Sequence, residues 1–160
     1  MRIIGIDPGL NNTGWAILEK SQNNIISYVR SGVLKCPAGD DMSFRLYKIF
    51  QELDSVIQLN QPKCASIEEI FVNTNAKTSL VLGFARGSIL ACLGKNAIPV
   101  EEYAPNTIKK TIVGHGKAHK DQVMKMLKLV IPNVTFGSND EADAIAIAYT
   151  GLVYPKLIKP

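Results

Sequence analysis

The chain has 160 residues, 46% of them hydrophobic, which fits one globular domain with a buried core and is too short for two large ones. Its three cysteines form no Cys-x-x-Cys pair, which argues against a zinc site or disulfide framework and favours a cytoplasmic protein. We expect no membrane span and no signal peptide, and the net charge of +4 is compatible with a nucleic acid partner.

Three strands are predicted at the start of the chain. An apolar, β-branched run over residues 2–6 ends at Asp7, where Pro8 and Gly9 turn the chain. Strands over 14–18 and 25–32 follow, with 33–34 as a continuation, and the short connections favour an antiparallel meander. Asp before Pro-Gly is ordinary turn chemistry, but a carboxylate at a strand end can also hold a metal ion.

The rest of the chain alternates helices and strands. Helical periodicity over 43–60 leads to a strand over 64–68, which a right-handed crossover would place parallel to the first strand, with its C-terminal end beside Asp7. A helix over 78–94 precedes a strand over 97–103, where Pro99 favours a sheet edge. Helices over 105–113, 118–130 and 138–153 complete one α/β domain.

Candidate carboxylates come from three of these segments. Asp7 ends the first strand, and either Glu68 or Glu69 ends the fourth, since strand periodicity cannot choose between two neighbours that point to opposite faces. Asp140 and Asp143 are three residues apart on the last helix and face the same way. Such oxygen ligands suit a hard divalent cation, and two ions can assist phosphodiester cleavage.

The last helix also has a purely structural explanation. Ser138 and Glu141 match a capping box, and acidic residues favour a helix N-terminus. Capping accounts well for Glu141, partly for Asp140 and poorly for Asp143, which we expect to lie in a buried stretch rich in Ala and Ile. A structural role therefore remains the alternative at these positions.

The motifs together resemble a known family. Gly-Ile-Asp-Pro-Gly at 5–9, Ile-Glu-Glu-Ile-Phe at 67–71, Leu-Gly-Phe-Ala-Arg-Gly at 82–87 and Asp-Glu-Ala-Asp-Ala at 140–144 match the RuvC family of bacterial Holliday-junction resolvases in order and spacing. The basic segment 108–122 is also similar, and the resemblance covers residues 1–151. Each motif is short, but the four in register are highly specific.

This resemblance implies a fold, a reaction and partners. The fold is RNase H-like, a five-stranded mixed sheet flanked by helices, as a single nuclease domain over 1–160. The implied enzyme is a homodimeric, magnesium- or manganese-dependent endonuclease with two ions per site, which nicks opposed strands of a four-way DNA junction in recombination and repair and works with the branch-migration complex. By motif position, the catalytic and metal-binding residues are Asp7, Glu68, Asp140 and Asp143.

The resemblance also suggests residues that contact DNA or a second subunit. Lys109 and Lys120 match positions that contact phosphate, and Phe71 matches an exposed ring that stacks on unpaired bases, although a core role is the alternative. Small residues four apart, Gly83, Gly87 and Ala91, allow close packing, either on the sheet or at a dimer interface. We expect His119 to be an exposed residue at a helix start rather than a DNA or metal contact.

Three other functions compete with junction resolution. The nearest is another RNase H-like nuclease that acts on structured RNA or branched DNA. A nucleotide-binding ATPase of the actin and sugar-kinase type would need two such domains, and 160 residues hold one. A catalytically inactive DNA-binding module would not need the four carboxylates.

Overall fold

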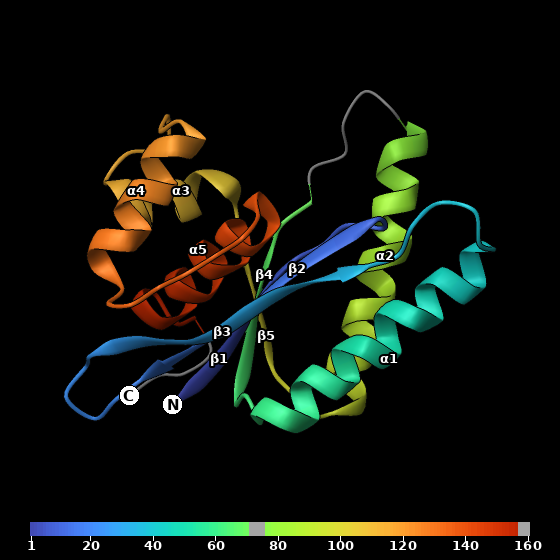
Figure 1. The fold of residues 1–160 in the computed structure, drawn as a ribbon, viewed down its shortest axis with the longest axis horizontal. Helices are drawn as coiled ribbons and strands as arrows, with labels where there is room; N and C mark the ends of the chain where they lie inside the picture. The colour runs from blue at the N-terminus through green and yellow to red at the C-terminus, as the bar shows by residue number, and fades with distance from the viewer. Residues whose placement is uncertain (71–75, 157–160) are drawn as a thin grey trace.

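The computed structural model describes residues 1–70 and 76–156. In this part of the chain one mixed sheet has the strand order β3-β2-β1-β4-β5 (Figure 1). The strands are β1 (Arg2–Asp7), β2 (Asn12–Lys20), β3 (Ile26–Lys35), β4 (Cys64–Glu68) and β5 (Val100–Tyr103). The helices are α1 (Met42–Asn60), α2 (Ala76–Lys95), α3 (Pro105–Val113), α4 (Lys120–Val130) and α5 (Asn139–Val153).

The strand pairing confirms the predicted meander and crossover. β1 pairs with β2, and β2 with β3, in antiparallel register, whereas β4 pairs parallel to both β1 and β5. β5 lies at the edge of the sheet, as Pro99 predicts. The α/β class and the five-stranded mixed sheet flanked by helices are therefore confirmed.

Helices cover both faces of the sheet, and β1 shows how the faces are divided. Ile3 belongs to the core under α3, α4 and α5, while Ile4 and Ile6 belong to the core under α1 and α2 (Figure 1). Gly5 lies on the α5 face, where a Cβ atom would be 2.2 Å from the carbonyl oxygen of Ala144. Since side chains alternate along a strand, Asp7 also points to the α5 face.

The boundaries differ from the predictions where backbone geometry intervenes. β2 and β3 are longer than expected because the hairpin between them stays paired from Asn12↔Lys35 to Lys20↔Ile26. β5 starts three residues later than expected, since Ala97 has a left-handed φ of 52° and Pro99 has no N–H to donate. α4 starts two residues late because His119 has an extended backbone before the helix. His119 is exposed, as predicted.

Candidate active site

The end of β1 is held against the first turn of α5. Asp7 pairs with Gly14 of β2, and a Cβ atom on Gly14 would lie 2.1 Å from the carbonyl oxygen of Asp140. The Thr13 hydroxyl donates a hydrogen bond of 2.6 Å to the carbonyl oxygen of Gly9 and fixes the turn between the strands. This role of Gly14 was not predicted; the available signal was a glycine at the start of a predicted strand, where the absence of a side chain allows another backbone to approach closely.

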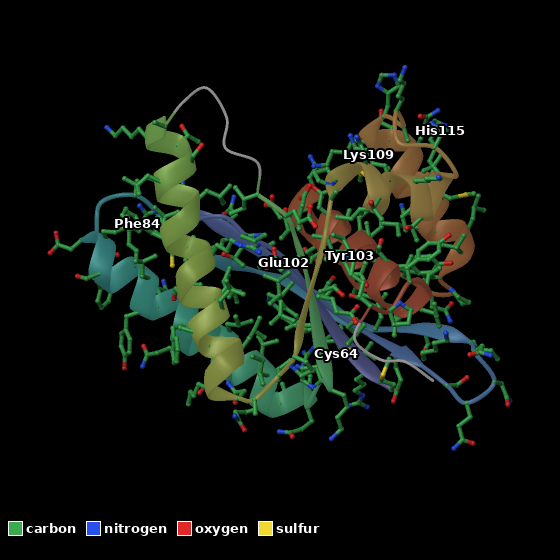
Figure 2. All side chains as sticks on the ribbon, turned by 180° about the vertical axis from the view of Figure 1, so that it is seen from behind. Cys64, Phe84, Glu102, Tyr103, Lys109 and His115 are labelled. Carbon is green, nitrogen blue, oxygen red and sulfur yellow. The ribbon has the colours of Figure 1, made fainter. Side chains whose placement is uncertain are left out.

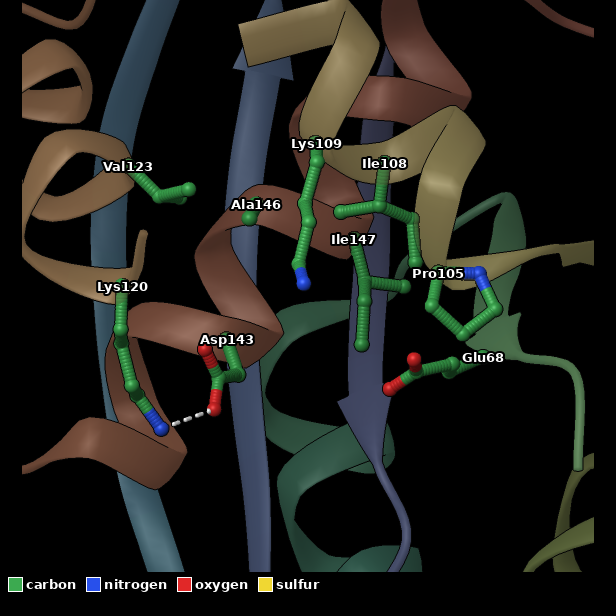
Figure 3. A pocket seen from close by; sticks show the side chains of 9 residues that line it. All are labelled: Glu68, Pro105, Ile108, Lys109, Lys120, Val123, Asp143, Ala146 and Ile147. Carbon is green, nitrogen blue, oxygen red and sulfur yellow. Dashed lines mark hydrogen bonds and ion pairs between the residues drawn. The ribbon is translucent and has the colours of Figure 1, made fainter. Parts of the chain in front are cut away.

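Strand alternation places Glu68 and Glu69 on different sides. Ser66 faces α5, where its hydroxyl lies 2.0 Å from the position of a Cβ on Gly151, so Glu68, two residues later, has the same direction. Glu68 lines a cavity of about 270 Å³ together with Lys109, Lys120 and Asp143 (Figure 3). An adjoining cavity of about 320 Å³ is lined by Asp7, Glu68 and Glu69. Of the two glutamates, only Glu68 lines both cavities.

Glu141 takes part in capping α5, whereas Asp140 and Asp143 remain candidate metal ligands. The Ser138 hydroxyl accepts a hydrogen bond of 3.2 Å from the main-chain N–H of Glu141, which confirms Ser138 as the N-cap and the first half of the predicted capping box. The Glu141 carboxylate accepts hydrogen bonds from the N–H of Gly137 and from the hydroxyl of Ser31. Asp140 is in the first turn of α5, and Asp143 is one turn further along.

Asp143 is more accessible than its sequence context suggests. Its neighbours Ala142 and Ala144 are buried, as expected, but the Asp143 side chain keeps 36% of its surface exposed. The expectation of a buried Asp143 was therefore wrong, because this face of α5 opens into the cavity that Glu68 lines. The Lys120 ammonium lies 2.7 Å from the Asp143 carboxylate (Figure 3).

The carboxylates are close enough to perturb one another. Burial and the negative charges of Asp143, Glu68 and Asp140 together raise the pKa of Asp7 to about 7, although Lys120 acts in the opposite direction. Burial and Asp143 likewise raise the pKa of Glu68, and Lys109 and Lys120 oppose this shift. Bringing these four acids together costs free energy unless cations compensate.

The donor chemistry fits a hard divalent cation. Carboxylate oxygens from β1, β4 and α5 face one region, where burial first and then the neighbouring negative charges raise the pKa of Asp7. As the side chains stand, no three Asp, Glu, His or Cys residues within 1–70 and 76–156 are close enough together to hold one ion. The ion pair with Lys120 compensates one of these carboxylates, Asp143.

Without divalent metal, Asp7 should make the fold less stable as pH rises. Its pKa is about 7 in the folded chain and 3.8 ordinarily, so the folded state binds this proton more tightly than the unfolded state. The contribution of Asp7 protonation to the free energy of unfolding is fully present below pH 3.8 and is lost as pH rises through 7. Asp7→Asn should therefore be more stable than wild type at pH 8, by up to about 4 kcal/mol.

Urea unfolding in EDTA at pH 4.5 and pH 8 measures this difference. Added magnesium should restore stability to wild type at pH 8 but not to Asp7→Asn. The same pH dependence in both proteins would contradict the assigned environment of Asp7.

Two of the three predicted DNA contacts lie at this site. Lys109 of α3 and Lys120 of α4 line the same cavity as Glu68 and Asp143 (Figure 3). Phe71 lies outside the described residues, so its predicted stacking role stays a prediction.

Comparisons with known proteins agree with the motifs and the fold. The family model described as crossover junction endodeoxyribonuclease RuvC matches residues 3–151. A crossover junction endodeoxyribonuclease RuvC from Rickettsia bellii is 47% identical over 154 residues, covering 96% of this chain and 98% of that one. The Rickettsia typhi protein of the same name is 45% identical over 157 residues, covering 98% of this chain and 99% of that one.

Solved structures extend the match to three dimensions. Thermus thermophilus RuvC in complex with a Holliday junction substrate superposes with a TM-score of 0.87 at 26% identity, covering 94% of this chain and 92% of that one. A second Thermus thermophilus RuvC structure gives a TM-score of 0.85, covering 98% and 96%. The fold is therefore RNase H-like, and the chain belongs to the RuvC family of crossover junction endodeoxyribonucleases.

Proposed function

We propose that this chain resolves four-way DNA junctions by metal-dependent nicks in two opposed strands. It acts in recombination and repair in the cytoplasm, as a single nuclease domain over residues 1–160, with the branch-migration complex as its partner at the junction. The observation that carries this proposal is the cluster of four carboxylates from β1, β4 and α5 beside two lysines at one end of the sheet.

The proposed site divides its residues between metal binding and DNA binding. Asp7, Glu68, Asp140 and Asp143 would hold two magnesium or manganese ions. Such ions, when bound, activate a water molecule and stabilise the leaving oxygen of a phosphodiester. Lys109 and Lys120, which line the same cavity, bind the phosphate backbone and set affinity rather than sequence preference.

A panel of substrates tests this function directly. Wild-type protein is incubated with a synthetic four-way junction, a linear duplex of the same sequence and a structured RNA, each with magnesium or EDTA. We expect cleavage of the junction alone, and only with magnesium. Preferential cleavage of the RNA would favour the other RNase H-like nuclease, and binding without any cleavage would favour a DNA-binding module.

Replacing Lys109 by Ala should weaken junction binding in a salt-dependent way. Removing one phosphate contact should lower the slope of log affinity against log salt by about one unit, with a clear loss at physiological salt. Fluorescence anisotropy in EDTA measures the slope. Lys125→Ala is the matched control, because Lys125 is exposed on α4 but lines neither carboxylate cavity. Equal slopes for the two variants would show that Lys109 does not contact the DNA phosphates.

The proposed homodimer rests on the outer face of α2. Leu80 and Phe84 are 58% and 42% exposed, and a Cβ on Gly83 or Gly87 would meet no atom within 4 Å. The alternative that the small residues pack on the sheet was therefore wrong. α2 is long and apolar enough to cross a membrane by length and composition alone, with 22% of its apolar stretch buried. A second copy of the chain would cover this face.

Gly87→Glu should convert the dimer to a monomer. The substitution meets open space within one subunit, so the melting temperature of the subunit fold should change little, while a charge enters the proposed interface. Sedimentation velocity measures the mass. Ser55→Glu on the exposed surface of α1 should leave the dimer intact. A wild-type monomer, or a Gly87→Glu dimer of unchanged affinity, would contradict this interface.

A further inference from the structure

One arginine connects α2 to the two parallel strands next to the candidate site. Arg86 Nη1 donates a hydrogen bond of 2.8 Å to the main-chain carbonyl oxygen of Glu68. Its Nη2 lies 2.5 Å from a carboxylate oxygen of Glu102 on β5. Figure 2 shows Glu102 on the side of β5 that faces α2. The Arg86 side chain is only 12% exposed, whereas the Glu102 side chain keeps 47% of its surface exposed.

The Glu68 carbonyl needs this donor because β4 loses a partner there. Pairing between β1 and β4 ends at Ile6↔Ile67, one residue earlier. The peptide group between Glu68 and Glu69 uses its N–H in a bond of 2.9 Å to the carbonyl oxygen of Tyr103 on β5. In a planar trans peptide the carbonyl points away from the N–H, so the Glu68 oxygen points away from Tyr103, past the end of the β1 ladder.

From this geometry we infer that Arg86 is a positioning residue, which acts on the metal site through Glu68. The inference rests on the proposed metal role of Glu68. Glu68 is the last residue of β4, and its carboxylate direction depends on the orientation of its own peptide group. A guanidinium can bind the carbonyl and the Glu102 carboxylate at once, because its donors form a rigid planar fork. Metal ligands need this kind of support to hold their geometry.

The surroundings of Arg86 separate this role from DNA binding. Its charge is paired with Glu102 and mostly buried, whereas Lys109 and Lys120 line the open cavity. Arg86 also lies on the same helix as Gly83 and Gly87, whose faces are open. The proposed dimer helix therefore contacts the end of β4 through Arg86.

Manganese binding to the metal-free wild-type protein and to Arg86→Ala tests this role. The free Mn²⁺ signal in electron paramagnetic resonance gives the affinity without any turnover. We expect Arg86→Ala to bind Mn²⁺ about 10- to 100-fold more weakly, as is typical when a residue that supports a ligand is removed. Junction binding in EDTA should be unchanged. Lys95→Ala is the matched control: it removes an ion pair of 2.6 Å with Asp54 of α1 at the C-terminal end of the same helix, and should keep wild-type affinity.

A double-mutant cycle distinguishes positioning from a general loss of structure. Since Arg86 acts through Glu68, adding Arg86→Ala to Glu68→Gln should weaken Mn²⁺ binding no further. Additive losses would overturn the inference, as would wild-type affinity in a folded Arg86→Ala protein. If Arg86→Ala does not fold, Arg86→Lys decides: it keeps the charge but not the fork, so reduced affinity supports the inference and wild-type affinity overturns it.

The same data separate this inference from the proposed function. If Glu68→Gln binds Mn²⁺ as wild type does, the proposed metal role of Glu68 is wrong, and so is the inferred positioning role of Arg86. If Glu68→Gln loses affinity and Arg86→Ala does not, only the inference is wrong.

Discussion

Asp7→Asn should reduce junction cleavage at least about a thousandfold while leaving junction binding intact or tighter. A carboxylate that holds a catalytic ion supports several kcal/mol of charge stabilisation in the transition state, and about 4 kcal/mol corresponds to this factor. Binding should not fall, because the substitution removes a negative charge from a site that already contains Glu68, Asp140 and Asp143. Single-turnover cleavage with magnesium and anisotropy in EDTA measure the two effects separately.

Glu68 and Glu69 provide the matched pair for this prediction. Glu68→Gln should lose cleavage as Asp7→Asn does, because Glu68 lines both cavities. Glu69→Gln changes the same chemical group one residue away, and should stay active, since its carboxylate is 4.0 Å from Lys156. Loss of junction binding in step with cleavage, or equal activity of the two glutamine variants, would argue against the metal role.

Gly5→Ala should be among the most destabilising single-methyl substitutions in the chain. The new Cβ would lie 2.2 Å from the carbonyl oxygen of Ala144 and 2.5 Å from the main-chain nitrogen of Ala148. Backbone atoms of a helix cannot rotate out of the way, so α5 must move away from β1. We expect a loss of about 3 kcal/mol in the free energy of unfolding, near the upper end for overpacked cores. Urea unfolding measures it.

The same substitution should also affect the site, because α5 carries Asp140 and Asp143. Gly94→Ala is the control: a Cβ there meets no atom within 4 Å, and stability should be unchanged or slightly higher. If Gly5→Ala is as stable as Gly94→Ala, the close packing of α5 on β1 is wrong.

Much of this arrangement could be predicted from local patterns. β4 and α3 have the predicted bounds, since an apolar run before a carboxylate and a Pro at the first helical position are strong local signals. The crossover rule correctly placed β4 beside β1. Asp7 and the end of β4 could therefore be brought together before any coordinates were known.

Strand periodicity alone could not choose between Glu68 and Glu69; the family resemblance chose Glu68, and the physical reason for that choice needed tertiary information. Periodicity shows that the two point to opposite faces but not which face α5 covers. The structure shows which face α5 covers: Gly5 of β1 lies against Ala144 and Ala148 of α5, and Gly151 of α5 lies against Ser66 of β4. The alanines of α5 were a usable signal: a helix rich in small residues can lie directly on strand backbones.

The orientation of α2 and the contact of Arg86 also depend on tertiary packing, so neither could be predicted from the sequence. A stripe of small residues permits close approach on either side of a helix, and α2 is apolar around most of its surface, so the pattern did not say which face meets the sheet. Only the packed fold shows that Gly83 and Gly87 face outward. Arg86 stood within a recognised motif, but its bond to the Glu68 carbonyl depends on where the β1 ladder ends.

A dimer with one inactive subunit shows whether both active sites are needed for the paired cut. One carboxylate cluster per chain makes one nick, so two opposed nicks require the two sites of a symmetric dimer. A heterodimer of wild-type and Asp7→Asn subunits is incubated with a supercoiled plasmid that carries an extruded cruciform. We expect nicked circles from the heterodimer where wild type gives linear DNA. Efficient linear product from the heterodimer, or from a monomer, would contradict it.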